Sequence, residues 1–341
     1  MTSVILMYHR IVERPGALPW FERGTAVTPA AFVRQMEWLV RHFEVVPVRR
    51  LLREERTLGN GERPRAAITF DDGYRDVVVH ALPTCQALGI IGTVFPVCGH
   101  QAASQPKLWF DELYLILQAA FERLGNDARV AHLSLNEWVR GEVKQRLQAS
   151  TPEMRSVILR ELARELDVGL ASDSLYLLDG ELEQLARSGW SVGGHGVTHS
   201  RLTMLSDNAV ADEVRASLQF ARSLDADEPL LAYPDGAVDA RVLEIARVLG
   251  VRWAFTVEPM VVRPEVESLS IPRFLCRGED SVPSRALAEM VALAPQENLP
   301  RLTVGDAGLH ELLDAQGVHQ RAKARERAVA QLELRLLADE P

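Results

Sequence analysis

The stretch that decides the fold is Thr69-Phe70-Asp71-Asp72-Gly73-Tyr74. It follows the apolar run Ala66-Ala67-Ile68, which predicts a buried strand. Side chains alternate along a strand, so the two aspartates start on opposite faces, and a turn at Gly73 lets both carboxylates reach one cleft. Adjacent carboxylates repel each other unless a cation or a shared proton lies between them. The pair therefore predicts a positive partner at the end of this strand.

A second polar stretch, far along the chain, offers that partner. It reads His195-Gly196-Val197-Thr198-His199, with two histidines four residues apart among glycines that favour a loop. One aspartate and two histidines would provide three ligands for a metal ion and leave a position open for water. The competing interpretation is an ordinary Asp-Gly turn and a chance pair of histidines. The two stretches together favour the metal site.

The composition limits the class of protein. The chain has 341 residues, 47% of them apolar, which is enough for one large core or for one core with a small appendage. Its 38 basic and 47 acidic residues give a net charge of −9, which argues against nucleic-acid binding. No apolar stretch reaches the ~18 residues that a transmembrane helix needs. We therefore expect neither a nucleic-acid partner nor a transmembrane segment.

The N-terminus and the cysteines bear on the compartment. Residues 1–9 have no basic segment before their short apolar run, so they predict a strand of the fold and not a signal peptide. The cysteines, Cys85, Cys98 and Cys276, are odd in number, and none has C-x-x-C spacing. This pattern favours reduced, buried thiols over disulfides or a cysteine zinc site. We therefore expect a cytoplasmic protein.

Strands and helices alternate along most of the chain. Strand-like runs are predicted at residues 4–8, 66–70, 90–97, 190–192, 230–233, 251–257 and 269–274, and helices lie between most of them. Thr28 before Pro29, Asp179 and Ser206 indicate the starts of three helices. About seven strand–helix units favour a parallel, barrel-like α/β sheet. The polar motifs follow strands, at the edge where ligands bind in parallel sheets.

Residues 105–178 interrupt this alternation and predict an inserted helical subdomain, called the insert below. The expected domains are a barrel formed by residues 1–104 and 179–282, the insert, and a helical C-terminal extension at residues 283–341. The insert could act as a lid or a binding surface, or could only add core. Trp109 and Phe110 at its start could belong to that core or stack on a sugar ring.

Three motifs resemble those of the polysaccharide deacetylases of the NodB-homology type, carbohydrate esterase family four. The stretch from Thr69 to Tyr74 looks like the first motif, and Gly194 to His199 looks like the second, an H-x-x-x-H metal motif. Leu231 to Gly236 looks like a variant of the third. The resemblance leaves out the insert and the C-terminal tail. Together with the strand count, it implies a distorted (β/α)7 barrel that carries these two additions.

The resemblance also assigns roles by position. Asp71 matches the catalytic base of the family, and Asp72, His195 and His199 match the ligands of a divalent metal, commonly zinc. A backbone N–H near Tyr233 would help to hold the oxyanion of the reaction. Tyr233 is equally suited to the hydrophobic core, and both interpretations stay open.

Two positions depart from the family pattern. Ala232 stands where the third motif usually has an arginine that braces the base, and we expect Arg273 to replace it; a surface ion pair is the alternative. The usual acid is a histidine in a C-terminal Leu-x-x-His setting, and the histidines after His199, His310 and His319, lie in helical tail sequence instead. A branch of the family begins with a strand ending in Met-Tyr-His, which Met7-Tyr8-His9 resembles. His9 is therefore the candidate acid, against a half-buried structural histidine.

The function implied by the resemblance is metal-dependent hydrolysis. The substrate would be an N-acyl group, usually N-acetyl, on an amino sugar of a polysaccharide, glycolipid or sugar precursor. One alternative is a hydrolase of another amide, such as a deformylase or an enzyme that cleaves a cyclic imide or ureide. A second is a non-catalytic carbohydrate-binding protein. The expected partner is an N-acylated sugar or glycan, and a homo-oligomer or a peripheral membrane association stays open.

Overall fold

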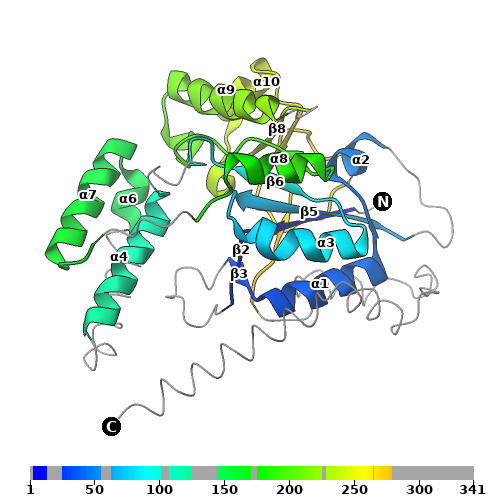
Figure 1. Ribbon diagram of the computed structural model, residues 1–341. Helices are drawn as coiled ribbons and strands as arrows, with labels where there is room; N and C mark the ends of the chain where they lie inside the picture. Colours follow the sequence, from blue (N-terminus) through cyan, green and yellow to red (C-terminus); the bar gives the residue numbers. More distant parts are fainter. Residues whose placement is uncertain are drawn as a thin grey trace, which may run out of the picture.

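Parallel strands joined in a ring form the centre of the fold (Figure 1). The computed structural model describes residues 3–13, 25–54, 63–100, 107–124, 144–169, 175–224, 228–263 and 265–278. Strands β10, β1, β5, β6 and β7 lie next to one another in that order, β8 pairs with β9, and all these pairings are parallel. The bounds are β1 Val4–Tyr8, β5 Arg65–Asp72, β6 Thr93–Pro96, β7 Ser191–Val192, β8 Leu230–Ala232, β9 Trp253–Phe255 and β10 Phe274–Leu275.

Two single bridges close the ring. A parallel bridge between Gly194 and Leu231 joins the end of β7 to β8, and a parallel bridge between Phe255 and Ile271 joins β9 to the segment before β10. The ring β1-β5-β6-β7-β8-β9-β10 confirms the predicted distorted barrel, whose two weak seams have one bridge each instead of a ladder. Among the described residues, three short strands lie outside the ring: β4 (Glu44–Val45) pairs with β5, and β2 (Arg10–Ile11) pairs with β3 (Ala26–Val27).

Alternate residues of the strands face two different cores. Leu6 and Ile68 pack in a large cluster with side chains of the outer helices, whereas Ile5 and Ala67 pack inside the ring. Both faces are therefore buried, which explains why these strands are apolar without polar alternation. Strand β5 keeps the alternation to its end, so Asp71 comes out on the inner face, the same face as Ala67.

The helices on the outside of the ring begin largely as predicted. Thr28 is the N-cap of α1, where its hydroxyl accepts the Ala31 N–H at 3.1 Å, and Ser206 is the N-cap of α9. The prediction for Asp179 is wrong by one residue: Leu178 is the N-cap of α8, and its N–H donates to Glu181. The bounds are α1 Pro29–His42, α2 Val48–Arg53, a π-helical turn Val77–Ala81 that continues into α3 Leu82–Leu88, α8 Asp179–Arg187, α9 Asp207–Ser223 and α10 Ala240–Val248.

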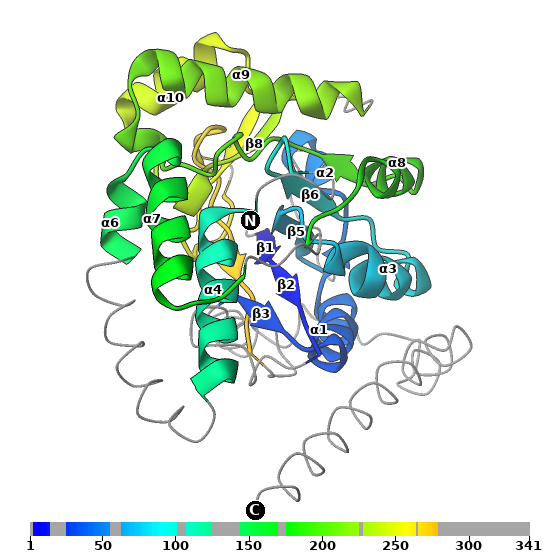
Figure 2. The same cartoon turned by 60° about the vertical axis from the view of Figure 1, so that its left-hand side comes forward.

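The insert forms its own small helical cluster. Its described helices are α4 (Trp109–Leu124), α6 (Lys144–Ala149) and α7 (Pro152–Glu165), and Leu113, Leu147 and Leu159 are among the buried residues at their contact. Figures 1 and 2 show these helices side by side at one end of the barrel. The predicted boundaries of the domains stay predictions, and residues 283–341 lie outside the described residues. None of the described helices is both long and apolar enough to span a membrane.

Candidate metal centre

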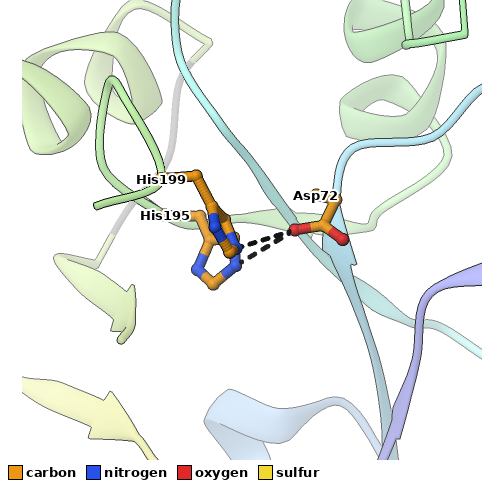
Figure 3. A group of neighbouring side chains, drawn as sticks. All are labelled: Asp72, His195 and His199. Atoms are coloured by element: carbon orange, nitrogen blue, oxygen red, sulfur yellow. Dashed lines mark ion pairs between the residues drawn. The ribbon is translucent and has the colours of Figure 1, made fainter. Parts of the chain in front are cut away.

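Asp72, His195 and His199 meet at one buried point (Figure 3). Oδ1 of Asp72 lies 3.3 Å from Nε2 of His195 and 3.2 Å from Nε2 of His199. Zinc binds nitrogen and oxygen ligands at about 2.0–2.2 Å, so two ligands on one tetrahedral ion are roughly 3.3–3.5 Å apart. Atoms of all three side chains lie within 4.8 Å of one another. The three residues therefore fit a divalent cation.

The charges at this point also favour a cation. Burial by itself would raise the pKa of Asp72, but hydrogen bonds with His195 and His199 hold that pKa well below its usual value. Burial by itself would lower the pKa of His199, and the contact with Asp72 outweighs this and raises it. The carboxylate thus keeps its negative charge in a dry pocket, where a metal ion can replace the protons of the imidazoles.

The backbone turns sharply to bring Asp72 to this point. Asp72 itself has a left-handed conformation with φ 66°, and Gly73 follows with φ 73°. A Cβ on Gly73 would lie 2.7 Å from Cβ of Pro96, so a glycine is needed there for space as well as for conformation. Asp72 adopts a conformation that non-glycine residues rarely take, and such strain is concentrated at functional sites. The turn predicted at Gly73 therefore begins one residue earlier.

The loop of residues 195–199, called the metal loop below, supplies the two histidines. Nδ1 of His195 lies 2.8 Å from the carbonyl oxygen of Ala232, which can only accept a hydrogen bond, so Nδ1 carries a proton and Nε2 is the nitrogen that faces Asp72 and that a cation would take. His199 has φ 49°, again in the left-handed region. The loop thus presents both Nε2 atoms to the same carboxylate oxygen.

Asp71 points inward and meets Arg273. The guanidinium donates to both carboxylate oxygens, from Nη1 to Oδ1 and from Nη2 to Oδ2, each at 2.7 Å. Arg273 is 0% exposed and Asp71 is 2% exposed, so the alternative of a surface ion pair is wrong. Burial by itself would raise the pKa of Asp71, but Arg273 outweighs it and lowers that pKa. The structure places Arg273 where the predicted brace would lie.

His9 follows β1 and lines the same cavity as Asp71 and Asp72. Tyr8 lies opposite Phe70 in the β1–β5 pairing, so the residues after them leave the sheet at the same edge. Nδ1 of His9 is buried and has no hydrogen-bond partner among the described residues. Burial lowers the pKa of His9, although the charges of Asp72 and Asp71 act in the opposite direction. The position suits an acid, and that role stays a prediction.

Tyr233 belongs to the packing of the barrel. Its hydroxyl donates to the carbonyl of Leu269 at 3.0 Å, and its backbone N–H donates to the carbonyl of Phe255 at 3.1 Å. The side chain is fully buried. Both donors of Tyr233 are therefore engaged within the fold, because the pairing of β8 with β9 continues through this residue. Tyr233 also lines the cavity that holds Asp71 and Asp72. Its contacts are those of a core residue, and its role in catalysis stays a prediction.

Sequence reasoning missed a buried carboxylate that the insert adds to the cavity. Asp111 is 1% exposed and accepts hydrogen bonds from the hydroxyl of Tyr74 at 3.0 Å and of Tyr176 at 2.6 Å. Tyr74 ends the first motif, whereas Tyr176 lies at the exit of the insert and Asp111 at its entry. An aspartate within an apolar helix was the available signal, but nothing in the sequence showed that these three residues meet.

The cavity over the metal point is about 170 Å³ in volume. The insert forms one wall of it, with Trp109, Phe110 and Asp111. The ring of Phe110 lies edge-on to that of His199, with centroids 5.0 Å apart. A larger cavity, about 470 Å³, is lined by residues of α8, β7 and the end of α9, and none of the predicted site residues lines it. The smaller cavity is therefore the candidate active site.

The fold and the site define the class of protein as a parallel α/β barrel with a buried Asp-His-His group. The family model for polysaccharide deacetylases matches residues 59–254, more than half of the chain. The chain belongs to the polysaccharide deacetylase family. The matched range contains both stretches of the metal point, whereas His9 and Arg273 lie outside it. No curated protein matches the chain.

Three solved structures illustrate the similarity of fold. A Streptococcus pyogenes deacetylase, PplD, in complex with acetate has 17% identity and a TM-score of 0.55, covering 85% of this chain and 98% of that chain. IcaB from Ammonifex degensii has 17% identity and a TM-score of 0.53, with 85% and 96% covered. A de-N-acetylase from Aggregatibacter actinomycetemcomitans has 12% identity and a TM-score of 0.51, with 85% and 100% covered. At these identities the likeness shows the barrel fold.

Proposed function

We propose that this protein is a metal-dependent hydrolase that removes an N-acyl group, in the first place N-acetyl, from an amino sugar. One observation supports this above the others: Asp71, paired with Arg273, lies directly beside the group formed by Asp72, His195 and His199. A carboxylate held in its ionised form next to a cation site has the arrangement of a base that activates water. Membership of the polysaccharide deacetylase family supports the same reaction.

Asp72, His195 and His199 would hold the metal, with zinc as the proposed ion. A divalent cation bound there supplies Lewis acidity: it lowers the pKa of water and polarises an acyl oxygen. The donor set of one carboxylate and two imidazoles is common for catalytic zinc and leaves coordination positions for water and substrate. Nitrogen and oxygen donors also suit other transition metals, so the identity of the ion is part of the proposal.

The other residues of the cavity have complementary tasks. Asp71 accepts a proton from the attacking water, and Arg273 keeps this carboxylate ionised and fixes its orientation. Water adds to the acyl carbon, the C–N bond breaks, and the products are a carboxylate and a free amine. His9 gives a proton to the leaving amine, for which its place in the cavity beside Asp71 and Asp72 is suited. An amine leaves poorly without that proton.

The developing oxyanion needs a donor other than Tyr233, whose N–H is engaged in the barrel. The turn Pro234–Gly236 follows directly, and Asp235 within it has a left-handed φ of 55° and lines the cavity. We assign the N–H of Asp235 to this role, because backbone N–H groups in such turns point toward anions.

The family and the small cavity support the proposed class of substrate. Among the similar structures, one is described in complex with acetate and another as a de-N-acetylase. These descriptions support an acetyl group as the part that is removed. A polysaccharide, a glycolipid or a nucleotide- or lipid-linked sugar would each present it. The cytoplasmic location, a homo-oligomer and a peripheral membrane association stay proposals.

The experiment is a metal-dependent release assay. The purified protein is stripped with a chelator, reloaded with Zn²⁺, and tested for acetate release from a panel of N-acetylated mono- and oligosaccharides, with other amides and cyclic imides as a second panel. We expect release from an N-acetylated sugar that stops on chelation and in Asp71→Asn. Release only from the second panel would support the alternative hydrolase. Release from neither panel by zinc-loaded protein would contradict the enzyme and favour a carbohydrate-binding protein.

A further inference from the structure

The metal loop has a conformation that other parts of the molecule must stabilise. Gly196 has φ 77° and His199 has φ 49°, so two of the five residues are left-handed, one of them without the freedom of glycine. A residue in this region persists only when its surroundings hold it there. The contacts around the metal loop should therefore show what keeps His199 in position to bind a cation.

On one side, a carboxylate from α9 binds the loop. Oε2 of Glu213 accepts the backbone N–H groups of Val197 and Thr198, the second at 3.1 Å, and Oε1 accepts the hydroxyl of Thr198. Glu213 is 8% exposed, and a Cβ on Gly196 would lie 2.8 Å from its Oε2. Buried charge-assisted hydrogen bonds of this kind are strong and fix geometry.

On the other side, an arginine from the insert reaches the same loop. Arg155 on α7 is 5% exposed, and its Nη1 donates to Oγ of Ser200, the residue after His199, at 3.2 Å. Its Nε donates to the carbonyl of Leu147 at 2.8 Å, and its guanidinium lies over the ring of Trp109 at 5.5 Å. One guanidinium therefore joins α4, α6 and α7 to the end of the metal loop.

Two hydroxyls connect this guanidinium to the carboxylate. The Oγ atoms of Ser200 and Thr198 are 2.8 Å apart. A guanidinium can only donate and an ionised carboxylate can only accept, so the protons must be ordered along the chain. Arg155 donates to Ser200, Ser200 to Thr198, and Thr198 to Glu213. Such a chain of hydrogen bonds from a cation to an anion is mutually polarised and strengthened.

We propose that Arg155 and Glu213 are positioning residues of the metal centre, and that the helical insert is thereby required for metal binding. The pair holds the backbone around His199 from both sides, so its Nε2 stays at Asp72. Phe110, also from the insert, packs against the ring of His199 itself. This inference rests on the proposed metal site and assigns the insert a task beyond forming a wall.

The experiment measures metal affinity and geometry, not turnover. Zn²⁺ binding to stripped protein is measured with a competing chelator, and the visible absorption of bound Co²⁺ reports the arrangement of ligands. We expect Arg155→Met and Glu213→Gln to raise the Kd for Zn²⁺ by about 10–100-fold, the usual effect of losing a group that orients a metal ligand, and to change the Co²⁺ spectrum. Arg155→Lys, which keeps a donor, should recover part of the affinity.

The controls separate this inference from its alternatives. Arg164→Met removes an exposed arginine of the same helix and should bind Zn²⁺ like the wild type. If Arg155→Met fails to fold, Ser200→Ala decides, because it interrupts the chain of hydroxyls and leaves the insert packed. Wild-type affinity and spectrum in Arg155→Met and Ser200→Ala would overturn the inference while the metal site stands. A wild-type protein that binds no metal would refute the proposed function itself, and this inference with it.

Discussion

Two neighbouring aspartates, one inside the barrel and one at its rim, have different positively charged partners. Asp71 lies inside, bound by the guanidinium of Arg273, a countercharge that the fold supplies permanently. Asp72 lies at the rim beside two imidazoles, whose protons a metal ion can replace. The difference follows from the alternation of side chains along β5 and the turn at its end. A catalytic base thus needs a positive partner that stays in place, whereas a metal ligand needs positive charge that a metal ion can replace.

The largest expected effect comes from removing the fixed countercharge. Arg273→Met leaves the carboxylate of Asp71 buried and unpaired, and breaking a buried ion pair in this way costs about 3–5 kcal/mol. The free energy of unfolding, measured with urea, should fall by that amount. Arg247→Met provides the comparison, because Arg247 is exposed and its ion pairs should contribute less than about 1 kcal/mol. A loss in Arg273→Met no larger than in Arg247→Met would contradict the argument.

The same pair predicts how this loss depends on pH. Arg273 lowers the pKa of Asp71 in the folded protein, so the pair stabilises the fold above the unfolded pKa of about 3.9 and stops doing so as the pH falls through the lower folded value. In Arg273→Met, burial without the guanidinium raises the pKa of Asp71, so the penalty of its buried charge is relieved as the pH falls through that raised value. The difference in stability between wild type and Arg273→Met should therefore narrow steadily as the pH falls, and the contribution of the ion pair itself is lost below about pH 4. Adding Asp71→Asn to Arg273→Met should recover stability at neutral pH, because no unpaired charge is then buried.

At the rim, the expected effect is smaller and reversible. Zn²⁺ at 100 times its Kd should stabilise the protein by about 2.7 kcal/mol, because it binds the folded state, and a chelator should remove this gain. Asp72→Asn should abolish the gain, whereas Asp207→Asn, an exposed aspartate at the start of α9, should keep it. Thermal unfolding with and without Zn²⁺ measures both. An equal gain in Asp72→Asn would place the metal elsewhere.

Local signals account for most of what the sequence predicted correctly. A few neighbouring residues determine each of three such features: the apolar strand β1, the Thr28 N-cap of α1 and the Asp-Asp-Gly turn after β5. The two histidines and the first motif also carry their chemistry locally, so residue types predicted one aspartate with two histidines. The resemblance to the family was needed to assign Asp72, and not Asp71, as that ligand.

Long-range contacts account for most of the rest. Arg273 and Asp71 are 202 residues apart, and only the missing arginine of the third motif pointed to their contact. The meeting of Asp111 with Tyr176 depends on how the insert enters and leaves the barrel, which no local pattern encodes. The N-cap of α8 was misplaced because Asp179 has a capping side chain, whereas the N–H of Leu178 is satisfied by Glu181.

The next effect in size concerns the hydrogen bonds of Tyr176, which attach the insert to the rim of the barrel. Tyr176→Phe removes the hydroxyl that donates to Asp111 and accepts the buried N–H of Leu108 at 2.9 Å. Leaving the buried N–H of Leu108 without this acceptor costs about 1–3 kcal/mol, and we expect the free energy of unfolding to fall by an amount within that range. Far-UV circular dichroism should show the helices intact. A change under about 0.5 kcal/mol, less than one typical hydrogen bond contributes, would mean that this network does not anchor the insert.

The smallest expected effect is that of Tyr233→Phe, which tests whether Tyr233 belongs to the interior of the barrel or to the rim of the cavity. Tyr233 adjoins the turn at the cavity, yet its hydroxyl donates to the carbonyl of Leu269 within the barrel. Tyr233→Phe keeps the ring and the backbone N–H, so it should lose one hydrogen bond, about 0.5–1.5 kcal/mol of stability, and keep kcat/KM within roughly twofold. Activity is measured on the best substrate of the release panel. A tenfold loss of kcat/KM without further loss of stability would show that the hydroxyl acts on the substrate. Tyr233 would then belong to the rim of the cavity, although its hydrogen bonds lie within the barrel.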